Sequence, residues 1–105
     1  MMGGNMDKPL YYVMLIERGE SYNKINKAMV VRHVDYIRAL DDRGALVLCG
    51  ATEGYPGVGG MVILNVGSHE EAEAICKSEP FVAEGYATYR LFALRVGNKD
   101  NDFLL

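Results

Sequence analysis

The order of apolar and polar positions along the chain predicts four strands and two helices. Residues 10–16 form a continuous apolar run rich in aromatic and branched side chains, which is typical of a central strand covered on both faces. Apolar residues then recur at helical spacing, which predicts a helix over about residues 23–42 that Gly44 ends as a C-terminal cap. Two shorter runs, residues 45–49 and 61–66, predict a hairpin of strands joined by a long glycine-rich loop.

The second half of the chain carries clear signals for where its elements start and stop. Ser68 and Glu71 have the Ser-x-x-Glu spacing of a capping box, which predicts the start of a second helix. Pro80 ends this helix, because proline disfavours the helical conformation at the residue before it. Residues 88–96 predict the last strand. The resulting β-α-β-β-α-β order is that of a ferredoxin-like α+β fold, with two helices on one face of an antiparallel sheet.

The predicted strands are apolar on both faces, so the face that the helices leave open needs a cover. A second copy of the chain is the simplest cover, and the pattern therefore predicts a homodimer. The 105 residues, half of them hydrophobic, are enough for one domain with one core. We expect this core over residues 10–96, with flexible tails at residues 1–9 and 97–105.

Charge and hydropathy narrow the range of partners. The net charge is −3 and the basic residues are scattered among acids, which argues against nucleic acid because phosphate contacts need clustered Lys and Arg. No run approaches the roughly 20 apolar residues needed to cross a bilayer. Residues 1–9 also lack the apolar run of a signal peptide. The sequence thus predicts a cytoplasmic protein without nucleic-acid or membrane partners.

Histidine and cysteine usage points to no metal and no cofactor. His33 and His69 are the only histidines, and neither has a partner at metal-ligand spacing. Cys49 and Cys76 fall in a predicted strand and a predicted helix without a close spacing motif, so we expect reduced, buried thiols.

The glycine-rich stretch at residues 54–60 superficially resembles a phosphate-binding loop. It lacks the lysine and hydroxyl of such a loop, and a strand follows it where a helix would be needed. The stretch is therefore either a flexible hairpin loop or a lid with Tyr55 as an aromatic wall.

His33 is the residue at which the pattern indicates chemistry. It lies three residues after Val30 and four before Ile37, so it shares one face of the first helix with apolar side chains. A titratable ring on such a face is either a hydrogen-bonded core residue or a group that stands at a cavity.

Glu79 is a carboxylate that the predicted fold can place beside His33. Pro80 imposes an extended conformation on Glu79, and both helices lie on the same face of the sheet. A carboxylate beside His33 would hold one tautomer and stabilise the imidazolium, which suits a general acid or base near neutral pH. In the alternative interpretation Glu79 is a solvated acid at a helix end and never meets His33.

Taken together, these motifs resemble the YCII-related (YciI-like) proteins over roughly residues 10–96. The residues that carry the resemblance are Arg32-His33-Val34-Asp35-Tyr36, Gly44, the glycine-rich hairpin, Ser68-His69-Glu70-Glu71-Ala72, Glu79-Pro80-Phe81 and Gly85. The family is similar to dimeric α+β barrel proteins, in which two ferredoxin-like sheets pack face to face. The resemblance therefore implies the same homodimer that the open sheet face predicts.

The family resemblance also implies a His–Asp pair in a pocket. The histidine maps onto His33, and the aspartate of an Asp-Pro-Phe/Tyr motif maps onto Glu79 of Glu79-Pro80-Phe81. Glutamate places its carboxylate one methylene further out, about 1.5 Å, the length of a carbon–carbon bond. Displacements of this size change rates strongly. Either the pocket has adjusted to the longer side chain, or the pair is weakened and the protein only binds.

The leading hypothesis is a small enzyme in which His33 moves a proton and Glu79 orients His33. One branch of the family resembles enzymes that act on chlorinated hydroxyquinone-type compounds, and related barrels include lactone isomerases, so a lyase, isomerase or dehydrochlorinase-like reaction on a small aromatic or lactone-like substrate is implied. Arg32 is a candidate to attract an anionic group, with a surface ion pair to an aspartate as the alternative. Tyr36 and Phe81 are candidate apolar walls, with core packing as the alternative.

Two other functions stay open. The chain is alternatively a non-catalytic dimeric module that keeps the fold and binds a small ligand without turnover. A third interpretation makes residues 103–105, Phe-Leu-Leu, a docking tail for another protein.

Overall fold

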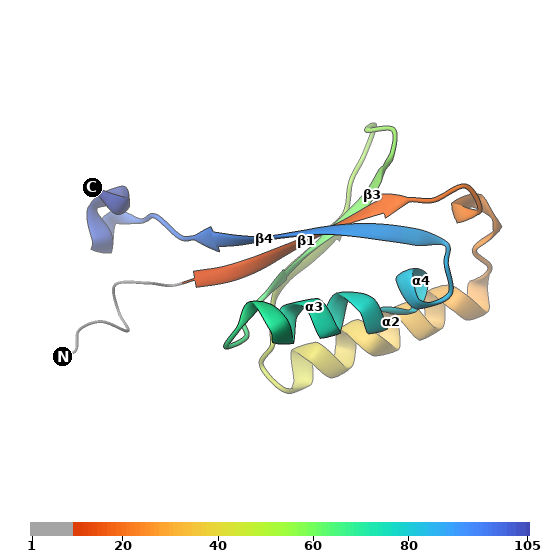
Figure 1. Ribbon diagram of the computed structural model, residues 1–105, viewed down its shortest axis with the longest axis horizontal. Coiled ribbons are helices and arrows are strands. Elements are labelled where there is room, and N and C mark those ends of the chain that lie inside the picture. Colours follow the sequence, from red (N-terminus) through yellow and green to blue (C-terminus); the bar gives the residue numbers. More distant parts are fainter. Residues whose placement is uncertain (1–9) are drawn as a thin grey trace.

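The computed structural model describes residues 10–105, so the tail expected at residues 1–9 lies outside the described part of the chain (Figure 1). The main elements are β1 (Leu10–Arg18), α2 (Lys27–Asp42), β2 (Leu46–Ala51), β3 (Val58–Leu64), α3 (His69–Ser78) and β4 (Ala87–Arg95). Three short helical segments join them, namely η1 (Tyr22–Lys24), α4 (Pro80–Ala83) and η2 (Lys99–Leu104). This order confirms the predicted ferredoxin-like α+β fold.

The strands form one antiparallel sheet in the order β2-β3-β1-β4. Figure 1 shows α2 and α3 together on one face of this sheet, with α4 between the end of α3 and the start of β4. Side chains of β1 alternate between the two faces, so Tyr12, Met14 and Ile16 point into the core beneath the helices. The core is closed from the helix side by Ala72 and Cys76, both fully buried.

The other face of the sheet is apolar and open within residues 10–105. Large hydrophobic side chains that remain exposed on it are Leu48, Met61, Phe92 and Leu94. The register places them there: Phe92 and Leu94 pair with Val13 and Tyr11 of β1, which alternate with the core-facing Tyr12 and Met14. Met61 pairs with Leu15, and Leu48 pairs with Ile63, the β3 partner of Val13. An exposed apolar surface spread over several strands is typical of an interaction surface.

Helix α2 begins four residues later than the periodicity predicts. The Asn26 side chain accepts a hydrogen bond from the Met29 backbone N–H at 2.9 Å and so caps the helix, which then starts at Lys27. The residues before this cap form the short 3-10 helix η1 instead. The end of α2 agrees with the prediction, because Gly44 adopts the left-handed conformation (φ +76°) that follows many helices.

The β2–β3 hairpin is longer, and its loop shorter, than the glycine content predicts. β2 extends to Ala51 and β3 begins at Val58, so much of the glycine-rich stretch is strand. Gly60 explains why: a Cβ there would lie 2.7 Å from the carbonyl oxygen of Gly50 on β2. The glycines therefore permit a close approach of two backbones as well as a turn.

Helix α3 has only half of the predicted capping box. The Ser68 hydroxyl accepts from the Glu71 N–H at 3.0 Å, but the Glu71 carboxylate accepts from Gly67 (3.2 Å) and not from the N-cap residue itself. The helix ends at Ser78 as expected, and Pro80 then starts α4. Proline fits there because its missing N–H is not needed in a first helical turn.

The two thiols have different environments, which corrects the prediction that both are buried. Cys76 is fully buried between α3 and the sheet, and this burial raises the pKa of its thiol to about 12. Cys49 is exposed on β2.

Residues 97–105 carry η2, whose first turn is capped by the Asn98 side chain, and Phe103 on it is 71% exposed. Across residues 10–105 no helix has the length and apolar character needed to span a membrane.

Candidate active site

His33 and Glu79 are in direct contact where α2 meets the start of α4. The Nδ1 atom of His33 lies 2.6 Å from Oε2 of Glu79, although 46 positions separate the two residues in sequence. Glu79 is only 1% exposed. The contact and the burial exclude the alternative in which Glu79 is a solvated acid at a helix end.

Glu79 is held in place by the backbone of the helix that it caps. Its other oxygen, Oε1, accepts hydrogen bonds from the N–H groups of Phe81 at 3.1 Å and Val82 at 3.3 Å. The extended backbone of Glu79 (φ −61°, ψ 130°) and Pro80 at the first helical position produce this cap. One oxygen is thus occupied by the fold, and the second is presented to His33.

The His33 ring is fixed on a second side by Phe81. The two rings are stacked, with centroids 4.4 Å apart and planes 6° from parallel. A carboxylate can only accept a hydrogen bond, so in the neutral ring Nδ1 carries the proton and Nε2 carries the lone pair. Among residues 10–105, Nε2 of His33 has no hydrogen-bond partner. His33 therefore presents a basic nitrogen in a fixed orientation.

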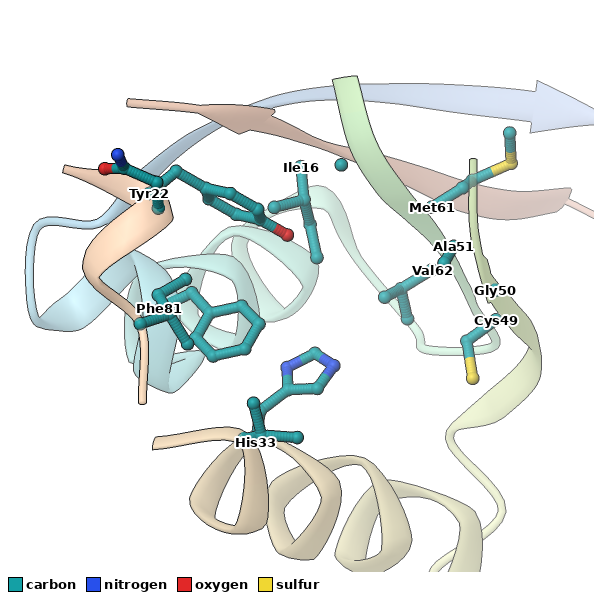
Figure 2. A pocket seen from close by; sticks show the side chains of 13 residues that line it. Ile16, Tyr22, His33, Cys49, Gly50, Ala51, Met61, Val62 and Phe81 are labelled. Carbon is teal, nitrogen blue, oxygen red and sulfur yellow. The ribbon is translucent and has the colours of Figure 1, made fainter. Parts of the chain in front are cut away.

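His33 and Phe81 stand at the wall of a cavity of about 600 Å³ between α2, η1 and the β2–β3 side of the sheet (Figure 2). The cavity is lined by Ile16, Tyr22, Asn23, Ile25, Val30, His33, Cys49, Gly50, Ala51, Gly59, Met61, Val62 and Phe81. Most of these side chains are apolar, and only a few carry polar groups. Both the volume and this mixture are typical of sites for small molecules.

Three residues named from the sequence as site candidates do not line this cavity. Arg32 is exposed on α2 and pairs with Glu84 at 3.6 Å, and not with Asp35 or Asp42, the two aspartates that the surface ion pair was expected to involve. The Tyr36 hydroxyl donates to the Ile75 carbonyl at 3.0 Å and so ties α2 to α3, and burial raises the pKa of this phenol. Tyr55 is 68% exposed in the hairpin turn.

Sequence reasoning overlooked other residues of the cavity wall. Tyr22 and Gly59 face the cavity from η1 and β3, and Cys49 faces it from β2. Tyr22 carried no signal because it falls between two predicted elements. Cys49 was assigned to the core from its place in a strand.

Residues 10–105 contain no group of three or more His, Cys, Asp or Glu side chains close enough to hold a metal ion. Cys76, the other thiol, lies in the core and not on the cavity wall. The site in this part of the chain is thus a histidine–carboxylate pair beside an apolar cavity.

The fold and this site together define a ferredoxin-like α+β protein with a histidine–carboxylate pair at a ligand-sized cavity. Residues 10–95 match the YCII-related domain, and the chain therefore belongs to the YCII-related family, as its motifs predict. The search among curated proteins found no match.

One similar solved structure is the 5-chloro-2-hydroxyhydroquinone dehydrochlorinase TftG from Burkholderia phenoliruptrix AC1100, in complex with 2,5-dihydroxybenzoquinone. It superposes with a TM-score of 0.58 at 18% sequence identity, over 89% of this chain and 99% of the dehydrochlorinase. At this level of identity the likeness supports the fold.

Proposed function

We propose that this protein is a small enzyme that uses His33 and Glu79 to move a proton on a small aromatic or lactone-like substrate bound in the cavity. The observation that carries the proposal is the 2.6 Å contact between the two side chains at the cavity wall. It leaves Nε2 of His33 without a protein partner in the described chain. A basic nitrogen in an apolar cavity suits general acid–base catalysis near neutral pH.

The proposed reaction begins with transfer of a substrate proton to Nε2 of His33. The electron pair left on the substrate moves into an adjacent carbonyl or ring, and Glu79 stabilises the imidazolium through Nδ1. The imidazolium then returns the proton at a different atom, which gives isomerisation, or a leaving group departs with its bonding electrons, which gives elimination. Loss of a proton and of chloride from a chlorinated hydroquinone yields a quinone, so no outside oxidant is needed.

In this proposal the groups around His33 and Glu79 hold the two side chains in place and take no part in the proton transfer. Phe81 keeps the His33 ring flat against its own ring, and the two backbone N–H groups keep the Glu79 carboxylate aimed at Nδ1. Orientation of this kind is worth several kcal/mol in well-placed catalytic groups. The side chains of Arg32, Tyr36 and Tyr55 lie off the cavity wall, so their contribution to substrate binding stays a prediction.

We also propose that the protein acts as a homodimer through the open face of its sheet. The face is apolar across all four strands, and its charged margin contains the pair Arg90–Glu17 at 3.9 Å. A two-fold axis would bring the same surface of a second copy against it. Most of the cavity wall lies on the helix side of the sheet, and Met61 is the lining residue that also belongs to the open face.

Turnover of defined probe compounds tests the catalytic proposal. The first probe is 5-chloro-2-hydroxyhydroquinone, chosen from the similar dehydrochlorinase, and its conversion is measured as released chloride. The second probe is a set of unsaturated lactones, whose conversion is measured by proton NMR in D₂O. We expect conversion above the buffer rate. Removal of a general base typically costs about 100-fold or more in rate, and we expect this loss in both His33→Gln and Glu79→Gln.

Lys77→Gln is the matched control, because Lys77 is an exposed residue of α3 outside the cavity. Its conversion rate should equal that of the parent protein. The proposal is wrong if His33→Gln converts the probes as fast as the parent. Saturable binding of the probes without any turnover would instead favour the non-catalytic binding module.

A further inference from the structure

A phenol that the proposed reaction does not use lies on the cavity wall across from α2. Figure 2 shows the Tyr22 hydroxyl pointing into the cavity, which the rings of Phe81 and His33 also border. Two other tyrosine hydroxyls are engaged, since Tyr36 donates to a carbonyl and Tyr89 to a carboxylate. The Tyr22 hydroxyl has no hydrogen-bond partner within residues 10–105, and it is not sealed from the cavity.

The Tyr22 ring is fixed by its neighbours. The rings of Tyr22 and Phe81 are in a T-shaped arrangement, with centroids 6.0 Å apart and planes at 76°. The Arg18 guanidinium lies 5.5 Å from the ring centroid. The backbone of η1 is closed by hydrogen bonds from Tyr22 to Gly19 and from Ile25 to Tyr22, each 3.2 Å long. The hydroxyl is therefore preorganised, and a ligand would not need to order it.

Gly59 provides the space that the phenol occupies. A Cβ at this position would lie 2.6 Å from the Tyr22 hydroxyl oxygen and 3.0 Å from the carbon that bears it. Any larger residue at position 59 would push the hydroxyl out of its present place. The glycine is thus tied to the position of one polar atom in the cavity.

We propose that the Tyr22 hydroxyl is a ligand-binding group that donates a hydrogen bond to an oxygen of a planar, oxygenated ring, with Gly59 keeping the phenol in position. The inference rests on the proposed function in treating this cavity as the ligand site, but it does not require turnover. The ligand class follows from the wall, which offers apolar side chains for a ring, one fixed hydroxyl donor, and the basic nitrogen of His33.

The hydroxyl also has a defined task if His33 removes a proton. The electron pair then moves toward a carbonyl or phenolic oxygen of the substrate, and a donor at that oxygen stabilises the developing charge. Tyr22 would contact the substrate directly in this role. A substrate without an oxygen in reach of Tyr22 would gain nothing from the phenol.

Ligand affinity in matched variants tests the assignment. The probe is 2,5-dihydroxybenzoquinone, and p-xylene serves as a ring of similar width without oxygen. Loss of one hydrogen bond typically weakens binding about 5-fold or more, and we expect this rise in Kd for the quinone in Tyr22→Phe. The Kd for p-xylene should stay within about 2-fold of the parent value, because dispersion contacts are kept.

Gly59→Ala should weaken quinone binding by a similar factor, and the losses of the two changes should not add, because both remove the same contact. The control is Tyr86→Phe, because Tyr86 lies between α4 and β4, off the cavity wall, and loss of its hydroxyl should leave the Kd unchanged. Thermal unfolding of each variant checks that the fold persists.

The outcomes separate this inference from the catalytic proposal. An unchanged Kd in Tyr22→Phe overturns the role of Tyr22, even if His33→Gln abolishes turnover. A raised Kd in Tyr22→Phe supports it, even if no variant or parent turns over any probe. Failure of the parent protein to bind the quinone at millimolar concentration overturns the assigned ligand class.

Discussion

At position 79 a single carboxylate serves two sets of donors. Oε1 accepts from two backbone N–H groups of α4, and Oε2 accepts from Nδ1 of His33. Both oxygens of a carboxylate can only accept hydrogen bonds, so whichever oxygen faces His33 requires a donor at Nδ1. The contact with Glu79 therefore sets which tautomer the neutral His33 ring adopts.

We predict that Glu79→Gln reverses the tautomer of His33. The amide oxygen must still accept the hydrogen bonds from the backbone N–H groups of α4. The amide NH₂ therefore faces Nδ1 and donates to it. Nδ1 then becomes an acceptor, and the ring proton moves to Nε2, which leaves no base at the cavity. Long-range ¹H–¹⁵N correlation spectra at pH 8, where an ordinary imidazole is neutral, should show protonated Nδ1 in the parent and protonated Nε2 in the variant.

His69 is the internal control for this measurement, because it is the only other histidine and its ring lies at the exposed start of α3. Its correlations should be the same in both proteins. Identical His33 spectra in the parent and in Glu79→Gln would show that the contact does not set the tautomer.

At the scale of elements, the β2–β3 hairpin depends on one close approach. The Cα of Gly60 faces the backbone of β2 so closely that a Cβ would lie 2.7 Å from the carbonyl oxygen of Gly50. A Cβ on Gly50 itself would meet nothing within 4 Å. Gly50 pairs with Met61 and Gly60 with Ala51, so the hairpin contains two neighbouring glycines on paired strands that differ in the space around them.

We predict that Gly60→Ala lowers the free energy of unfolding by about 1–3 kcal/mol, because the backbones must separate to admit the methyl group. Gly50→Ala is the matched control and should change it by no more than about 0.5 kcal/mol. Urea denaturation measures both values. Equal midpoints for the two variants would contradict the steric argument.

The elements also show what the sequence can and cannot predict. The periodicity identified all six main elements, and the placement of both helices on one face brought His33 and Glu79 together. The start of α2 was wrong because the Asn26 cap competes locally with helix extension, which a hydrophobic pattern does not register.

The opposite wall of the cavity was harder to predict. Leu46 and Cys49 both face the helix side although three positions separate them, because the pairing of β2 with β3 shifts between Leu46 and Leu48. A shift of one residue moves the following side chains to the other face, and simple alternation cannot anticipate it. Tyr22 depends likewise on how η1 folds back onto Phe81, a contact between distant parts of the chain.

At the scale of the whole molecule, helices cover one face of the sheet and leave the other exposed to solvent. The helices bury one face, whereas Leu48, Phe92 and Leu94 remain exposed on the other. Burial of apolar area is worth roughly 25 cal/mol per Å², so a second copy would stabilise the protein as well as hide this surface.

We predict that the parent protein has twice its chain mass of 11.6 kDa in solution and that Phe92→Asp converts it to single chains. A buried, unpaired carboxylate at the centre of an apolar interface opposes association. Light scattering coupled to gel filtration measures the mass. Val31→Asp is the control, since Val31 is at least as exposed as Phe92 but lies on α2. A single-chain mass for the parent at micromolar concentration would contradict the dimer.

The capping role of Glu79 links the evolution of the site to the spacing of the helices. If glutamate replaces an ancestral aspartate at this position, the cap of α4 is kept. The carboxylate oxygen that faces the histidine then moves outward by about 1.5 Å, the length of one carbon–carbon bond. The histidine must then retreat by a similar distance to preserve a 2.6 Å contact. Relatives with aspartate at this position should therefore hold α2 closer to α4. In this protein, Glu79→Asp alone should leave the carboxylate out of hydrogen-bond reach of His33.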